Sequence, residues 1–212
     1  MPKTRLKEKR EKSIQSILNA AREVFAEKGF AGARVDEIAE RAHVNKAMIY
    51  YRLGDKKELY SLALHDIVGN TVEHISNDIK IDDSTETKLK KYIRNLAKVM
   101  KANPFLPLIM MREIASGGDN LPEVVIEDIL RIMSVLTDIV NEGIKKGVFI
   151  EVDPFTLHII LIGSLVFLKG SASVRDIHNA LLSKYINPQS HNNSHAAKEI
   201  ENLILRAVVK DI

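Results

Sequence analysis

Cationic, amide and phenolic side chains gather in one short stretch of the first quarter of the chain. Asn45 and Lys46 stand at the start of an expected short helix, and Tyr50 and Tyr51 follow one turn later. Ammonium and hydroxyl groups bind phosphate oxygens, and the first residues of a recognition helix reach base edges in the major groove. We therefore predict a DNA-reading helix in which Asn45, Lys46 and Met48 face the bases.

Two short helices joined by a tight turn must position these side chains. Apolar residues recur in the segment 35–51, VDEIAERAHVNKAMIYY, at the i, i+3, i+4 and i+7 spacing of one helix face. His43 interrupts this pattern, and Asn45 is a favoured N-cap for a second helix. The first helix would bury Val35, Ile38, Ala39 and Ala42, and the second would bury Ile49 and Leu53.

The residues flanking these two helices resemble a known family. The matching positions are Ile17-Leu18-Asn19-Ala20-Ala21, Phe25, Gly29-Phe30, Ile38-Ala39, Ala42, Val44, Lys46, Ile49-Tyr50-Tyr51 and Lys56-Lys57-Glu58-Leu59. In order and spacing they resemble the DNA-binding domain of the TetR (tetracycline-repressor-like) regulators over roughly residues 13 to 60. The resemblance implies a helix-turn-helix protein that binds a specific DNA sequence and is usually a repressor.

Three positions depart from the family pattern. His43 stands where the family has a turn glycine, and histidine tolerates positive φ at some cost. Arg34 stands near the usual hydroxyl cap and could reach a phosphate instead. Ala47 stands where a glycine often permits close approach to DNA. The resemblance adds Lys56 as a contact to the DNA backbone.

The remaining pattern predicts an all-α protein of about nine helices. Residues 1–55 would form a three-helix DNA-binding domain, whose first helix is capped by Ser13 and ended by Gly29 and is preceded by a basic arm at 1–12. Residues 56–212 would form a helical domain for ligand binding and dimerisation. The basic excess supports this division, because residues 1–60 hold 14 Lys and Arg against 9 Asp and Glu.

Other function classes find little support in the sequence. The chain has no cysteine, no GxSxG, HExxH or dinucleotide-binding motif, and we predict no catalytic residue and no cofactor. His191 and His195 have a metal-compatible spacing but lie in an Asn/Ser-rich loop without a third ligand, so we predict no metal. A sequence-independent DNA architectural protein remains the alternative, although phosphate-driven binding favours a larger basic excess than this chain has.

The N-terminus lacks the apolar core of a signal peptide. The longest apolar run, 155–168, is shorter than the ~20 residues that a membrane span requires. We therefore expect a cytoplasmic protein with no membrane contact.

Two apolar helices near the C-terminus predict a homodimer. The helix at 154–169 is apolar nearly all round, and the helix at 196–210 is too apolar for a single core face. Pairing with their two-fold mates would form a four-helix interface, as in the family. The dimer would hold two recognition helices ~34–36 Å apart on a palindromic operator. The alternative, that both are core helices of a monomer, stays open.

The family also implies a cavity for a small-molecule effector in the second domain. Its expected lining consists of bulky or flexible side chains with two polar contacts: Met100, Phe105, Met110, Met111, Arg112, Met133, His158 and Phe167. An apolar lining favours a largely hydrophobic ligand. Any of these methionines could instead be gap-filling core. Ligand binding would change the separation of the recognition helices and release the repressor.

Overall fold

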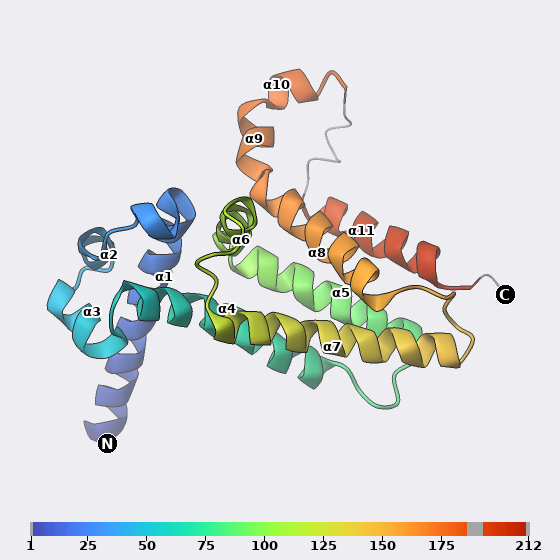
Figure 1. Cartoon of the computed structure of the whole chain (residues 1–212), viewed down its shortest axis with the longest axis horizontal. Helices are drawn as coiled ribbons and strands as arrows, with labels where there is room; N and C mark the ends of the chain where they lie inside the picture. Colours follow the sequence, from blue (N-terminus) through green and yellow to red (C-terminus); the bar gives the residue numbers. More distant parts are fainter. Residues whose placement is uncertain (1, 186–192, 211–212) are drawn as a thin grey trace.

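The computed structural model describes residues 2–185 and 193–210 and forms eleven α-helices (Figure 1). Within those ranges no β-strand is present, and the only β pairing is an isolated antiparallel bridge between Phe149 and Val209. Nine of the helices have seven or more residues. The predicted all-α class is confirmed.

The N-terminal domain contains α1 (Pro2–Gly32), α2 (Val35–Arg41) and α3 (Lys46–Leu53). The predicted break at Gly29 is confirmed, since its φ of 69° interrupts α1. Phe30 then turns back, so that its ring centroid lies 6.3 Å from that of Phe25 and 5.1 Å from that of Tyr60. These aromatic contacts attach the end of α1 to the next domain.

The basic arm at 1–12 is not a separate segment. Helix α1 begins at Pro2 and runs through Ser13 without interruption, so Ser13 is not its cap. The reason is local: residues 3–12 are mostly Lys, Arg, Glu and Leu, which are good helix formers, and proline is tolerated in a first turn.

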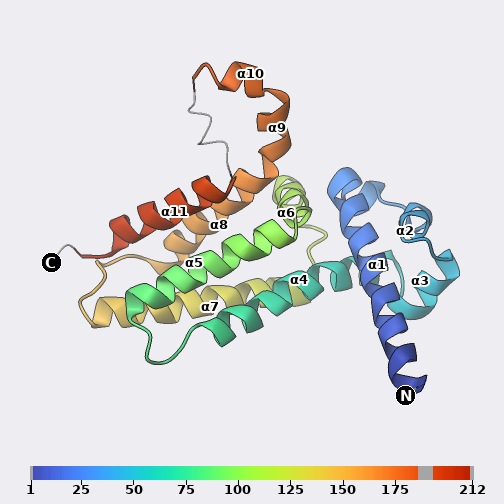
Figure 2. The same ribbon diagram turned by 180° about the vertical axis from the view of Figure 1, so that it is seen from behind.

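The second domain begins with the helix that connects it to the first. Its helices are α4 (Lys56–Asp78), α5 (Thr85–Ala102), α6 (Leu106–Ala115), α7 (Glu123–Lys145), α8 (Pro154–Gly170), α9 (Ala172–Ile177), α10 (Asn179–Leu182) and α11 (Asn193–Val208). Helices α4, α5, α7, α8 and α11 form a bundle, while α9 and α10 project from one end of it (Figures 1 and 2). Helices α9 and α10 are short, with six and four residues.

Short-range capping fixes several helix starts. Asp55 forms a complete capping box with Glu58 at the start of α4, and Asp153 accepts a hydrogen bond from the Thr156 N–H at the start of α8. Among the described helices none is long and apolar enough to span a bilayer. His191 of the considered metal pair lies outside the described residues.

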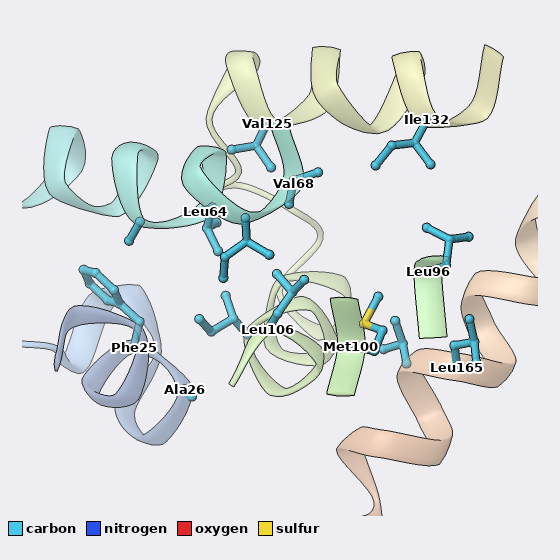
Figure 3. Packing of buried hydrophobic residues seen from close by; sticks show 14 of the residues in the cluster. Phe25, Ala26, Leu64, Val68, Leu96, Met100, Leu106, Val125, Ile132 and Leu165 are labelled. Carbon is cyan, nitrogen blue, oxygen red and sulfur yellow. The ribbon is translucent and has the colours of Figure 1, made fainter. Parts of the chain in front are cut away.

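One apolar core runs through both domains (Figure 3). It passes from Phe25 on α1 through Leu64 and Val68 on α4 to Leu106 on α6. From there it continues to Leu165 on α8. Because α4 packs against both α1 and α7, it connects the N-terminal domain to the bundle through close-packed side chains.

Candidate nucleic-acid interface and ligand cavity

The turn between α2 and α3 sets the angle of the recognition helix. His43 has a φ of 54° and is the sole non-glycine residue with positive φ in the described chain. Its N–H donates to Glu40 O at 3.1 Å, and the Val44 N–H donates to Ala39 O at 3.0 Å. The expected left-handed turn residue is therefore present without glycine, at the steric cost that such a residue carries.

Helix α3 presents a polar face because its other face is held in the core. Asn45 Oδ1 accepts the Ala47 N–H at 2.8 Å, which confirms the predicted N-cap. Ile49 and Leu53 are buried, whereas Tyr51 is 89% exposed. Ala47 and Tyr50 are exposed on the same outward side. The arrangement is that of a short helix free to enter a groove.

Two side chains of α3 have contacts that the sequence did not indicate. Lys46 Nζ lies 2.8 Å from Asp36 Oδ1 and 5.8 Å from the centroid of the Tyr50 ring. The hydrogen bond to Asp36 raises the pKa of Lys46, so its ammonium is charged at neutral pH. Met48 is half-buried, and its sulfur accepts a weak hydrogen bond from Ser13 Oγ at 3.9 Å.

Arg34 and Lys56 differ in their availability. Arg34 is exposed at the start of α2 and makes no side-chain cap there. Lys56 Nζ donates to Phe30 O at 3.0 Å and lies 3.3–3.4 Å from Ala31 O and Ala33 O. The Lys56 ammonium thus binds carbonyl oxygens at and just after the end of α1, and its contact with the DNA backbone stays a prediction.

An apolar cavity of about 300 Å³ lies between helices α4 to α8. Its lining includes four of the predicted residues, Met100, Met110, Met133 and His158. Thr71 and His158 supply the polar side chains, and Thr71 Oγ1 is already bonded to Ile67 O at 2.8 Å. Burial lowers the pKa of His158, so its imidazole is neutral at pH 7.

The other four predicted lining residues lie elsewhere. Phe105 borders a separate cavity of about 300 Å³ next to Arg22 of α1. Met111 packs toward the backbone of Gly170, where an added Cβ would lie 2.1 Å from its sulfur. Phe167 is 66% exposed on α8. Arg112 Nε and Nη2 donate to Ala26 O and Glu27 O of α1, each at 2.7 Å. Sequence spacing gives the face of a helix but not its neighbour.

Helix α6 therefore contacts both the cavity and the DNA-binding domain. Met110 and Ile114 line the cavity, while Arg112 binds α1 from another face. Glu113 is buried, and its Oε1 accepts the Tyr60 hydroxyl at 2.7 Å, which links α6 to α4 as well. Sequence reasoning missed Glu113, although it falls on the buried stripe of α6 with Leu106 and could have been found there.

A stripe of apolar side chains on α8 and α11 faces outward. Ile160 is 51% exposed, Phe167 is 66% exposed and Leu203 on α11 is 62% exposed. Gly163 lies in the same stripe, and an added Cβ there would have no atom within 4 Å. The helix at 154–169 is thus apolar on a face that residues 2–185 and 193–210 leave uncovered.

Comparison with known proteins agrees with the geometry. The model of bacterial regulatory proteins of the tetR family matches residues 17–63, and that of the YsiA-like protein C-terminal region matches residues 64–171. The fatty acid metabolism regulator protein of Bacillus subtilis is 28% identical over 142 residues, covering 67% of this chain and 73% of that protein. The transcriptional regulator RutR of Escherichia coli is 27% identical over 140 residues, covering 66% of each chain.

Solved structures show the same fold. FadR from Bacillus subtilis in complex with stearoyl-CoA superposes with a TM-score of 0.71 at 20% identity, covering 91% of this chain and 98% of that one. FadR from Bacillus halodurans, a fatty acid degradation regulator, gives a TM-score of 0.72 at 23% identity, covering 91% and 94%. With a helix-turn-helix domain, a helical second domain and matches along both, this chain belongs to the TetR family of transcriptional regulators.

Proposed function

We propose that this regulator is a dimeric repressor that leaves a palindromic operator when a largely hydrophobic ligand enters the cavity between α4 and α8. The observation that carries the proposal is the position of α6. One face of this helix lines the apolar cavity, and Arg112 on another face is bonded to α1. Ligand binding that shifts α6 would therefore act directly on the DNA-binding domain.

The polar face of α3 supports the assignment of DNA contacts. Asn45, Lys46 and Met48 would meet base edges from the first turns of the helix, with the backbone near Ala47 close to the DNA. Tyr50, Tyr51 and Arg34 would bind phosphates. Lys46 has to exchange its bond with Asp36 for a DNA partner, so binding should release this exposed ion pair.

Selection of bound sequences from a random DNA library tests this reading. The expected result is a palindrome with two half-sites, and Lys46→Ala or Tyr50→Phe should weaken binding to it. A matched control is Lys145→Ala on α7, which is exposed and far along the chain from α3. Binding that depends steeply on salt but enriches no sequence would instead favour an architectural protein and contradict the specific repressor.

The dimer is proposed from the outward apolar stripe of α8 and α11. Pairing of Ile160, Phe167 and Leu203 with their two-fold mates would remove these side chains from water, and Gly163 would permit close helix approach. Ile160→Asp combined with Phe167→Asp should yield monomers in sedimentation velocity. Ile81→Asp, at a 93% exposed position in the α4–α5 loop, should remain dimeric. A dimer that survives the double substitution would place the interface elsewhere.

The chemistry of the cavity favours a long acyl chain as ligand. Its walls are almost wholly aliphatic and methionine side chains, which adapt to flexible hydrocarbon. FadR from Bacillus subtilis, which shares this fold, has been solved with stearoyl-CoA. Stearoyl-CoA is accordingly the first probe to test for release of the selected operator.

Blocking the cavity separates ligand binding from DNA binding. Met133→Trp should fill the space and abolish the response to stearoyl-CoA, whereas Ser134→Trp, on the exposed side of the same helix, should leave it unchanged. By linkage, operator DNA should weaken stearoyl-CoA binding by the same factor by which stearoyl-CoA weakens operator binding. Equal responses of the two variants would refute this cavity as the effector site.

A further inference from the structure

A second groove, of about 270 Å³, lies between α5, α8 and α11 and shares no lining residue with the apolar cavity. Its floor is apolar, with Ile93, Ala97 and Leu165, but its rim is cationic. Five basic side chains border it against a single carboxylate, that of Glu201. The basic residues are Arg94, Lys98 and Lys101 on α5, Lys169 on α8 and Lys198 on α11.

The one carboxylate is already occupied. Arg94 Nε and Nη2 donate to Glu201 Oε2 and Oε1 at 2.9 and 2.8 Å, and Lys198 Nζ donates to Oε1 at 2.6 Å. The Glu201 side chain is 3% exposed, so water screens its charge little and its carboxylate is neutralised by Arg94 and Lys198. Within the part of the chain that the structure describes, Lys98, Lys101 and Lys169 form no ion pair with an acidic side chain.

Lys169 is the most unfavourably placed of these cations. It is half-buried in the last turn of α8. Burial lowers the pKa of its ammonium, and the positive charges of Lys101 and then Arg175 lower it further. The negative end of the α8 dipole offsets only about half a unit charge. A partly desolvated ammonium beside two other cations is stabilised when an anion joins them.

We propose that this groove binds the phosphate groups of a small phosphorylated ligand. Phosphate carries more than one negative charge and accepts hydrogen bonds on several oxygens, which matches three unpaired ammonium groups better than a single carboxylate does. Duplex DNA is not the ligand proposed, because the groove is a concave site in the bundle, away from α2 and α3 in both views (Figures 1 and 2).

The phosphate could come from two sources. It could belong to the nucleotide end of an acyl thioester whose chain enters the apolar cavity, which rests on the proposed function. It could also belong to a separate phosphorylated metabolite. The groove and the cavity lie on different faces of α5, since Ala97 and Lys101 border the former, whereas Leu96 and Met100 border the latter. The cationic site is the same in either case.

Isothermal titration of the full-length protein with inorganic pyrophosphate and with coenzyme A tests the site. We expect binding by the wild-type chain and at least tenfold weaker binding by Lys101→Gln combined with Lys169→Gln. The control Lys145→Gln, an exposed lysine on α7 outside the groove, should bind as the wild type does. Circular dichroism establishes that the variants are folded.

A second readout does not depend on ligand identity. Without phosphate, Lys169→Gln removes a repelled and half-buried charge, so the variant should melt at a higher temperature than the wild type. Added pyrophosphate should raise the melting temperature of the wild type more than that of the variant. A merely solvent-facing lysine would give neither effect.

The outcomes separate the possibilities. One outcome is that stearoyl-CoA releases the operator, pyrophosphate binds without releasing it, and the double substitution weakens both stearoyl-CoA release and pyrophosphate binding. This outcome would support the site and assign the phosphate to the acyl thioester. If pyrophosphate binds at the site but the double substitution leaves operator release by stearoyl-CoA unchanged, the site is supported and its ligand is a separate phosphorylated metabolite. No binding of either phosphate probe, or equal binding by the double variant, would overturn the proposal. Failure of the proposed repressor function would appear in separate experiments, namely as no enriched palindrome in the library selection or as an unchanged response of Met133→Trp to stearoyl-CoA.

Discussion

The link between α6 and α1 yields the sharpest prediction for this regulator. Replacing Arg112 with methionine keeps a flexible stem of similar length but removes both hydrogen bonds to α1. These bonds, from Nε to Ala26 O and from Nη2 to Glu27 O, are each 2.7 Å long. Both acceptors belong to the last helical turn before Gly29, where carbonyl groups lack helical partners and attract a cation.

The size of the effect follows from the exposure of the two bonds. A hydrogen bond to a charged group contributes about 1.5–3 kcal/mol. The bond to Glu27 O is exposed and contributes little, so the pair should contribute about 2 kcal/mol in all. For a chain of this size, such a loss lowers Tm by roughly 4–8 °C. The same free energy of about 2 kcal/mol is the largest coupling that this contact can carry between ligand and operator, and it corresponds to about a 30-fold change in operator affinity.

The assay compares operator affinity with and without saturating stearoyl-CoA, by fluorescence anisotropy. In Arg112→Met, the ligand should still bind, because Arg112 lies outside the cavity, but the ratio of the two operator affinities should fall by up to about 30-fold. Lys145→Met is the control for loss of an exposed cation. If Tm falls as expected while the ratio stays at its wild-type value, α6 does not transmit the signal through this contact, and the reasoning is refuted.

Three further predictions concern stability. Burial lowers the pKa of His158, so the unfolded chain binds a proton at a higher pH than the folded chain does. The free energy of unfolding should therefore fall as the pH decreases below about 6.5. In urea titrations between about pH 7 and 5, His158→Gln should reduce this pH dependence. Gly143→Ala should destabilise the fold by about 1–3 kcal/mol, because its Cβ would lie 2.1 Å from the buried Phe149 ring. Gly163→Ala meets open space and should stabilise the monomer by up to about 1 kcal/mol. Equal melting temperatures of the two variants would contradict this prediction. His43→Gly should raise stability by up to about 1 kcal/mol by relieving its positive φ, and an unchanged or lower denaturation midpoint would show that the His43 side chain contributes more than its backbone costs.

The sequence predicted those features whose causes are local. Asn45 caps α3 and Gly29 interrupts α1, because in each case the interacting groups lie within a few residues. His43 belongs to the same group, since the turn geometry depends on its own φ. Asn45 and His43 set the start and the turn of α3, so the local geometry of the candidate DNA-binding face could be predicted, while its DNA contacts stay a prediction.

The roles of Lys56 and Arg112 were not predictable in the same way. Lys56 binds the carbonyl of Phe30, 26 residues away, and Arg112 binds that of Ala26, 86 residues away. A periodic pattern identifies the face of a helix but not the element opposite it. For the same reason Met110 lines the cavity, whereas Met111, one position along the same helix, packs against Gly170.

The length of α1 before its interruption at Gly29 has a mechanical consequence. From Ala26, where α6 is attached, the helix extends back to Pro2 over 24 residues, or about 36 Å at 1.5 Å per residue. A rigid rod of that length acts as a lever, so a tilt of about 5° at the α6 end displaces the other end by about 3 Å. Under the proposed function, a tilt of this size caused by a bound ligand would shift the N-terminal end of α1 by about the rise of one base pair, ~3.4 Å.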